Sequence, residues 1–214
     1  QLQKGDLLHI AFTSGQSGSV NNAYIAAETL REKYPERKIQ VIDSLCSSSG
    51  YGLLVDEAAD LRDAGRSLEE TAQWVLANRN KVHHQFFSSD MTQFHRTGRV
   101  SGATAMVASI MNICPIMRLD SKGAIKAYGK VRGKKNAVKE TICTMEQHAQ
   151  GGVNYSGKCF ICHSNCPAEA EATRQAVAEH FPHIQGDIRV NEIGTIIASH
   201  CGPGTLGVLF LHRA

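Results

Sequence analysis

A short loop near the start of the chain, "TSGQSGS" at residues 13–19, is rich in hydroxyl groups and glycines. The apolar run before it, at 7–12, is typical of a buried strand, and the segment at 21–33 has apolar residues at helical spacing. The loop is therefore expected at the amino end of a helix, where free N–H groups and the helix dipole favour an anion such as a carboxylate or a phosphate. An equally weighted alternative is that Ser17, Ser19 and Asn21 only cap this helix.

The common nucleotide-binding loops do not fit this segment. No Gly-Lys-Ser or Gly-Lys-Thr follows it, as a Walker A loop requires, and "SGQSGS" lacks the third glycine of a dinucleotide fingerprint. We therefore do not expect a nucleotide at this loop.

A second candidate for binding an anion is the turn "HCGPG" at residues 200–204. It lies between two apolar runs, 193–199 and 206–211, that we interpret as strands. Glycines at 202 and 204 permit positive φ angles and a close approach of the backbone to a ligand. His200 can donate a hydrogen bond to an anion, although a histidine in such a place more often has a structural role.

The cysteine-rich segment "CFICHSNC" contains the Cys-x-x-Cys-His pattern of haem attachment, which also suggests a metal knuckle. The segment 158–163 is expected to be a strand that precedes a helix starting at Pro167, so Cys159 and Cys162 would point to opposite faces. No second Cys-x-x-Cys pair completes a zinc site. We expect buried, inert thiols, with a metal or haem site as the minor alternative and no cofactor.

Composition limits the functional classes. The net charge of +3 over 214 residues is too small to indicate nucleic-acid binding. No apolar stretch has the length of a transmembrane helix, and the start of the chain has no signal-peptide pattern. Seven scattered cysteines in a chain of this size indicate reduced thiols, so we expect a cytoplasmic protein.

The secondary structure expected for the first part of the chain is a parallel βαβ unit. The strands at 7–12 and 39–43 flank the helix at 21–33. A polar loop, "DSLCSSSGYG", then leads into a helix over "LLVDEAADLRDAG", and a capping box from Ser67 to Glu70 begins another helix.

The pattern changes near residue 84. Beyond it we expect a helix through Met106 and Ile110, then an antiparallel hairpin around the turn at 120–123. The fold class is therefore α/β, with an incomplete parallel βαβ domain at 1–84 and an α/β domain with a mixed, largely antiparallel sheet at 85–214.

The motifs "TSGQSGS", "VIDS", "HRTGRVSG", "CPIMRLDSKGAI", "GKVRGKKNAV" and "HCGPGTLG", in this order, resemble the DegV family of bacterial fatty-acid-binding proteins. The resemblance covers nearly the whole chain. It implies that a long-chain fatty acid lies between an amino-terminal α/β domain, of which 1–84 would be the carboxyl-terminal part, and a carboxyl-terminal domain. The resemblance also implies that the protein catalyses no reaction itself. It would present the carboxyl group of the bound fatty acid to a separate ATP-dependent fatty-acid kinase.

The resemblance also implies roles for particular residues. Ser17 corresponds to the serine that holds the carboxylate, with Ser14 and Gly18 in the same loop, and His200 corresponds to the histidine nearby. Arg132 falls on the arginine of the family's Lys-Val-Arg segment, where it would contact the partner or the head group. A solvated basic face is the alternative for this stretch.

The sequence also departs from the family pattern. It has Ser-Gly-Ser-Val for Ser-Gly-Thr-Tyr, Thr97-Gly98-Arg99 for Gly-Gly-Arg, and Cys114-Pro115 for Lys-Pro. The family's first strand, ending in Thr-Asp-Ser, and its Thr-Ser-Gln-Pro loop, whose threonine is a second carboxylate ligand, do not occur in this sequence. We therefore expect that the family's amino-terminal segment is missing.

Two other classes of function remain open. One is an acyl-transfer enzyme with Ser17 as nucleophile and His200 as base, although the sequence has no Gly-x-Ser-x-Gly elbow. The other is a regulatory or interaction module that carries no lipid.

Overall fold

The computed structural model describes residues 5–100 and 112–212. The described strands form two sheets, a two-stranded sheet of order β1-β2 and a six-stranded sheet of order β5-β4-β3-β8-β6-β7. The strands are β1 Leu7–Ala11, β2 Ile39–Asp43, β3 Val82–Ser88, β4 Ile113–Leu119, β5 Ile125–Arg132, β6 Phe160–His163, β7 Arg189–Glu192 and β8 Thr205–Leu211. The α-helices are α1 Ser19–Lys33, α2 Ser48–Asp63, α3 Leu68–Asn78, α4 Thr92–Arg96, α6 Lys134–His148, α7 Pro167–His180 and α8 Thr195–Cys201.

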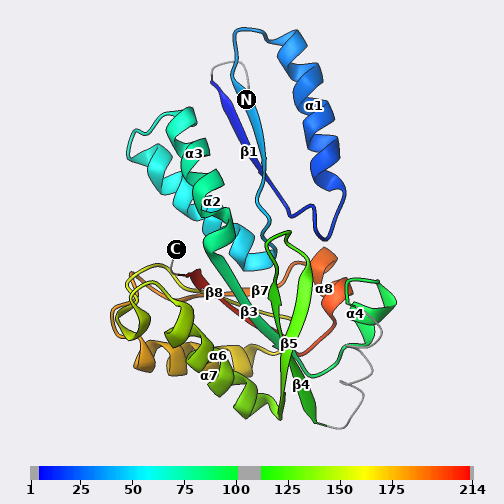
Figure 1. Cartoon of the computed structure of the whole chain (residues 1–214), viewed down its shortest axis with the longest axis vertical. Coiled ribbons are helices and arrows are strands. Elements are labelled where there is room, and N and C mark those ends of the chain that lie inside the picture. The colour runs from blue at the N-terminus through cyan, green and yellow to red at the C-terminus, as the bar shows by residue number, and fades with distance from the viewer. Residues whose placement is uncertain (1–4, 101–111, 213–214) are drawn as a thin grey trace.

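The small sheet confirms the expected parallel βαβ unit. β1 and β2 pair in parallel, with Leu7 opposite Ile39 and Ala11 opposite Asp43. The crossover helix α1 covers one face of this sheet, and α3 contacts both strands from the other side (Figure 1). The capping box at the start of α3 is also confirmed, because Ser67 Oγ accepts from the N–H of Glu70 at 3.2 Å and the Glu70 carboxylate accepts from the N–H of Ser67 at 2.9 Å.

The large sheet is mixed and largely antiparallel. β3 pairs antiparallel with β4 and β8, β6 pairs antiparallel with β8, and only the β6–β7 pair is parallel. β4 and β5 form the expected hairpin around the turn at 120–123. Helices α6 and α7 cover one face of the sheet and α2 contacts the other (Figure 1). Residue 84 lies inside β3, and the division into domains 1–84 and 85–214 is a proposal.

Alternating side chains of the large sheet enter two separate hydrophobic cores. On β6, Cys162 belongs to the core on the α2 side, whereas Ile161 belongs to the core beneath α6 and α7. On β8, Leu209 faces the first core and Phe210 the second. This alternation is what a strand covered on both faces requires.

The prediction of a strand at 193–199 is wrong, because this segment enters α8. Ile193 and Cys201 are buried and Ile197 packs against the same core, while Ile196 is 78% exposed. Spacing of four residues between the buried positions is helical, but a short apolar run does not distinguish a helix from a strand by itself. The helix expected over "LLVDEAADLRDAG" begins earlier than predicted, at Ser48.

The helix expected through Met106 and Ile110 lies outside the described residues. Among the described helices, none is long and apolar enough to cross a membrane.

Candidate functional site

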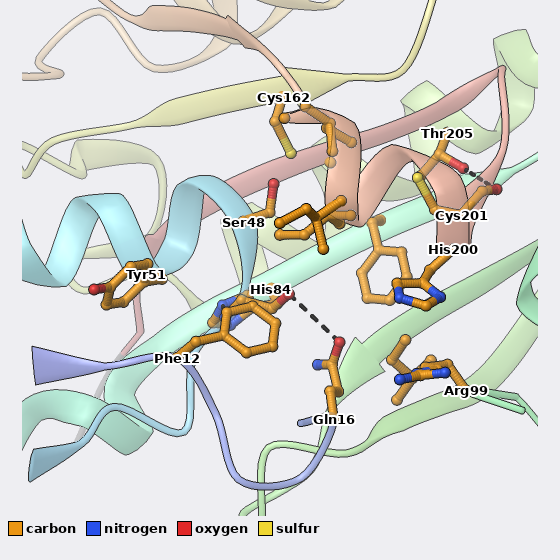
Figure 2. Close-up of a pocket in the computed structure, with 18 of the residues that line it drawn as sticks. Phe12, Gln16, Ser48, Tyr51, His84, Arg99, Cys162, His200, Cys201 and Thr205 are labelled. Atoms are coloured by element: carbon orange, nitrogen blue, oxygen red, sulfur yellow. Dashed lines mark hydrogen bonds between the residues drawn. The ribbon is translucent and has the colours of Figure 1, made fainter. Parts of the chain in front are cut away.

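A cavity of about 600 Å³ lies between α2, α8 and the large sheet, and the loop that follows β1 closes one side of it (Figure 2). Pockets of several hundred Å³ with mostly apolar walls and a few polar groups are typical of small-molecule sites. The apolar part of the wall comes from segments far apart in the chain and includes Phe12, Phe86, Phe94, Leu119, Ile125, Ile193, Ile197 and Leu209.

The loop after β1 is held in place by the hairpin turn between β4 and β5. Thr13 Oγ1 donates to the carbonyl of Gly123 at 3.3 Å, and Gln16 Nε2 donates to the same oxygen at 3.0 Å. Gly15 approaches the turn so closely that an added methyl group would lie 2.4 Å from the carbonyl oxygen of Lys122. This contact positions Gln16 and Ser17 on the cavity wall.

The loops after β1 and β2 are joined by one carboxylate. Asp43 Oδ1 accepts from the N–H of Ser14 at 3.1 Å and from the N–H of Leu45 at 3.0 Å. Both loops follow parallel strands, so they meet at the same edge of the small sheet. The amino termini of α1 and α2 are thereby brought to the cavity, where Ser17, Ser19, Ser47 and Ser48 line its wall.

Polar side chains gather toward one end of the cavity. Gln16, Arg99 and His200 all line it, and Figure 2 shows them grouped away from Tyr51 and Cys162. The Arg99 guanidinium donates to the carbonyl of Thr97. His200 Nδ1 is buried and has no hydrogen-bond partner among the described residues. A buried ring nitrogen without a partner costs free energy, which a ligand carrying hydrogen-bonding groups would recover.

Ser17 lines the cavity and also makes a hydrogen bond at the start of α1. Its Oγ accepts a hydrogen bond from the N–H of Ser19, the first residue of α1, at 3.2 Å. The N-cap position itself is occupied by Gly18, and α1 has no side-chain cap hydrogen bond there. The Ser17 hydroxyl hydrogen can still donate into the cavity, because a hydroxyl group is both donor and acceptor.

His84 is a polar residue of the cavity wall whose hydrogen bonds are satisfied. Its Nε2 accepts from the N–H of Ser47 at 3.1 Å, and its Nδ1 lies 2.9 Å from the carbonyl oxygen of Val82. Burial lowers the pKa of this imidazole to about 4. The ring is therefore neutral near pH 7, with its proton on Nδ1.

The structure does not bring every predicted site residue to the cavity. Ser17 and His200 both line it, whereas Ser14 and Gly18 are exposed and do not. Arg132 is the last residue of β5, exposed and outside the cavity wall. Gln16, Arg99 and His84 line the cavity although the sequence did not single them out as ligand contacts. The sequence held a signal for Gln16, which is next to Ser17, and for Arg99, which lies in the motif "HRTGRVSG". It held none for His84.

The serine-nucleophile alternative requires an oriented base. Because His200 Nδ1 has no partner among the described residues, no carboxylate orients the ring through that atom, as a catalytic triad would require.

The cysteines are all free thiols. Cys159, Cys162 and Cys166 of the segment "CFICHSNC" are buried, as expected, and of the other four only Cys143 is exposed. Cys159 and Cys162 belong to the two different cores, on opposite faces of the large sheet. Across the described part of the chain, no group of three or more His, Cys, Asp or Glu side chains is placed to hold a metal ion.

Relatives with similar sequences are DegV domain-containing proteins. One from Clostridium perfringens is 35% identical over 206 residues, which is 96% of this chain and 69% of the relative. One from Lactococcus lactis is 32% identical and matches 97% of this chain and 70% of its own length.

Solved structures with the same fold include fatty-acid-binding members of the family. A DegV family protein from Eubacterium eligens loaded with heptadecanoic acid has a TM-score of 0.89 and 22% identity, and covers 98% of this chain and 74% of that chain. The Streptococcus pneumoniae Fatty Acid Kinase (Fak) B3 protein loaded with linoleic acid has a TM-score of 0.87 and 24% identity, and covers 97% of this chain and 72% of that chain. A fatty-acid-binding DegV family protein from Thermus thermophilus is 26% identical, has a TM-score of 0.84, and covers 99% of this chain and 72% of that chain.

The family described as "Uncharacterised protein, DegV family" matches residues 1–213 of the sequence. Together with the relative that is 35% identical, this match shows that the chain belongs to the DegV family.

Proposed function

We propose that this protein binds a long-chain fatty acid in the cavity and presents its carboxylate to a partner fatty-acid kinase, without catalysing a reaction itself. The observation that carries the proposal is the arrangement of the cavity wall. It is mainly apolar, and toward one end it holds Gln16, Arg99 and His200, whose Nδ1 has no partner in the part of the chain that the structure describes. An apolar tail with a single anionic head is the ligand chemistry that fits this arrangement.

The tail supplies the affinity. Burial of an acyl chain is favourable by about 0.8 kcal/mol per methylene, so fourteen methylenes contribute roughly 11 kcal/mol before the costs of association. The head group supplies the direction, because a carboxylate left without hydrogen bonds inside the cavity would be strongly unfavourable. The ligands of the related structures, heptadecanoic and linoleic acid, support this class of ligand.

The head-group site is tested by replacing Arg99 and by removing the charge from the ligand. Hydrogen bonds to charged groups contribute about 1.5 to 3 kcal/mol, so Arg99→Gln should weaken palmitate binding by roughly 10- to 150-fold. Arg96→Gln is the matched control, because Arg96 is the exposed last residue of α4, three positions before Arg99, and does not line the cavity. Methyl palmitate should bind the wild type and the Arg99 variant with nearly equal affinity. Equal loss of affinity for both ligands would contradict the proposed head-group contact.

Ser17→Ala separates the two roles of the loop. If Ser17 donates to the carboxylate, we expect palmitate binding to weaken about 10-fold or more. If it only supports the amino terminus of α1, the free energy of unfolding should fall by about 1 kcal/mol while affinity stays unchanged. The measurement is a pair of titrations on each protein, one with lipid and one with urea.

Native mass spectrometry of the protein purified from bacteria distinguishes the classes of function. A co-purifying C14 to C20 acid supports the binding protein. A covalent acyl adduct on Ser17 would instead indicate an acyl-transfer enzyme, and a protein that neither carries nor takes up lipid would indicate an interaction module.

The partner-kinase step rests on Arg132. This exposed cation at the end of β5 is available to a partner that must reach the carboxyl group. Arg132→Ala should leave stability and lipid binding unchanged while slowing phosphorylation of the bound acid by the kinase. Lys126→Ala, an exposed cation near the other end of β5, should have a smaller effect, and equal rates for the two variants would refute the assignment of Arg132.

A further inference from the structure

Two buried hydroxyl groups lie close to the end of the cavity that holds Arg99 and His200. Ser88 is the last residue of β3 and Thr205 is the first residue of β8, and the two are opposite each other in the large sheet. Ser88 is fully buried and Thr205 is 4% exposed. Thr205 lines the cavity and Ser88 does not, so the Ser88 side chain cannot touch a ligand there.

The Thr205 hydroxyl holds the carboxyl end of α8, the helix that carries His200. Thr205 Oγ1 is placed to donate to the carbonyl oxygen of Cys201, the last residue of α8, at 3.2 Å (Figure 2). The backbone of Thr205 is itself fixed, because its carbonyl accepts from the N–H of Ser164 at 2.9 Å. His200 Nδ1 has no partner in the described part of the chain. That atom is therefore positioned by the backbone of α8 and not by a hydrogen bond.

The Ser88 hydroxyl holds the segment that leads to Arg99. Ser88 Oγ donates to the carbonyl of Asp90 at 2.8 Å and accepts from the N–H of the same residue at 3.3 Å. Asp90 Oδ1 accepts from the N–H of Thr92, the first residue of α4, at 2.8 Å. The N–H of Arg99 donates to the carbonyl of Phe94 in the same helix at 3.1 Å. The position of α4 therefore determines where the Arg99 side chain enters the cavity.

Ser88 and Thr205 also contact each other, and this hydroxyl pair joins the two segments. Thr205 Oγ1 is placed to donate to Ser88 Oγ at 3.1 Å. Helices α4 and α8 contact each other as well, and a methyl group added to Gly202, which follows α8, would lie 3.1 Å from Gln93 Cγ on α4. A change at either hydroxyl is therefore transmitted to both helices.

We propose that the hydroxyl pair positions the head group of the ligand, because it fixes the distance between Arg99 and His200. The strength of a hydrogen bond falls steeply as its distance and angle depart from the optimum. A carboxylate is therefore held well only when its donors are fixed by the residues behind them. The inference rests on the proposed binding of a fatty acid with its carboxylate at this end of the cavity.

The experiment compares the affinities for palmitate and methyl palmitate in variants of the hydroxyl pair. Ser88→Ala should weaken palmitate binding by about 10-fold and change the affinity for methyl palmitate by less than about twofold. The ester carries no charge, so it reports on the packing of the tail without the charge-assisted hydrogen bonds. Thr205→Val nearly keeps the shape of the side chain and should reproduce this difference. Thr205→Ser keeps the hydroxyl and should bind palmitate within about twofold of the wild type.

Thr173→Val is the matched control for the loss of a buried hydroxyl. Thr173 is also fully buried, and its hydroxyl donates to the carbonyl of Glu169 at 2.7 Å, but it does not line the cavity. This variant should lower the midpoint of urea denaturation and leave both affinities unchanged. Because the hydroxyl pair acts as a unit, Ser88→Ala in a Thr205→Val background should cause little further loss of palmitate affinity.

Unchanged palmitate affinity in Ser88→Ala, or equal losses of affinity for palmitate and its methyl ester, would overturn the inference. A loss in Thr205→Val without one in Ser88→Ala would also overturn it, because Thr205 would then act on the ligand directly. Urea titrations establish that each variant is folded. If Ser88→Ala does not fold, Ser88→Cys takes its place, because a thiol of similar size makes only weak hydrogen bonds.

The wild type separates this outcome from that of the proposed function. Palmitate binding by the wild type, with no selective loss in the variants, refutes only the positioning role of the hydroxyl pair. Absence of palmitate binding by the wild type refutes the proposed function and, with it, this inference.

Discussion

The contact between Gly50 and His84 gives a sharp test of how α2 is seated on the large sheet. Gly50 is in the first turn of α2, and a methyl group added to it would lie 2.2 Å from His84 Nε2. His84 is only 5% exposed and makes hydrogen bonds through both ring nitrogens, to Ser47 and Val82. Gly50→Ala therefore forces either the imidazole or the helix to move.

The expected magnitude follows from opposing terms. Overfilling a tightly packed interior costs about 1–3 kcal/mol. Loss of the hydrogen bond from Ser47 leaves a buried N–H group without its acceptor, which costs a further ~1–3 kcal/mol. Alanine is favoured over glycine inside a helix by about 1 kcal/mol, which offsets part of the loss. We expect Gly50→Ala to lower the free energy of unfolding by about 2–3 kcal/mol.

Gly52→Ala is the matched control, because Gly52 lies in the same helix and, apart from its chain neighbours and the adjacent backbone of α2, no described atom lies within 4 Å of the position of an added methyl group. This control should raise stability by about 0.5–1 kcal/mol. The assay is urea denaturation of both variants and the wild type, with equal slopes indicating the same folded state. In a His84→Ala background the clash is absent, so Gly50→Ala should cost much less there. If Gly50→Ala is as stable as Gly52→Ala, the close contact with His84 is refuted.

Three further predictions concern acid stability, an ion-pair cluster and metal content. Burial lowers the pKa of His84 to about 4, below its ordinary value of about 6.5, so the unfolded chain takes up the proton first as the pH falls. The contribution of His84 to the free energy of unfolding should therefore be full above pH 6.5 and fall by up to about 3 kcal/mol toward pH 4. His84→Gln should reduce this pH dependence, measured by urea titrations at pH 7 and 4.5. Lys158 Nζ lies 2.6 Å from the Asp56 carboxylate and 3.9 Å from that of Glu57, and it also contacts Asp60. Lys158→Met should lower the free energy of unfolding by about 1–3 kcal/mol at pH 7 and by less at pH 3, where the carboxylates are protonated. An equal loss of stability at both pH values would contradict the ion-pair explanation. Protein purified without chelator should contain far less than one zinc or iron per chain by elemental analysis. A stoichiometric metal would contradict the interpretation that the cysteines do not bind a metal ion.

The sequence by itself determined those elements whose signals are local. The period of apolar residues and the turn residues predicted the parallel βαβ unit, the hairpin at 120–123 and the capping box at Ser67, and the structure confirms all three. These features depend on contacts between residues close in the chain, so their residue types are sufficient to specify them. The loop at 13–19 and the histidine at 200 were recognised in the same way, from hydroxyls, glycines and a turn, and Ser17 and His200 both line the cavity.

Only the tertiary structure decided where the long-range neighbours lie. The segment that enters α8 was predicted to be a strand, although its buried positions are four residues apart, as in a helix. This spacing could not be recognised from the sequence, because the burial of Ile193 and Cys201 depends on the sheet beneath them. Gln16 reaches the cavity because Gly15 packs against the backbone of a hairpin turn more than 100 positions later. A cavity is space left by such distant contacts, and its shape follows from how whole elements pack together. The residue pattern of one segment therefore could not predict that Arg99 would line the cavity while Arg132 would remain outside it.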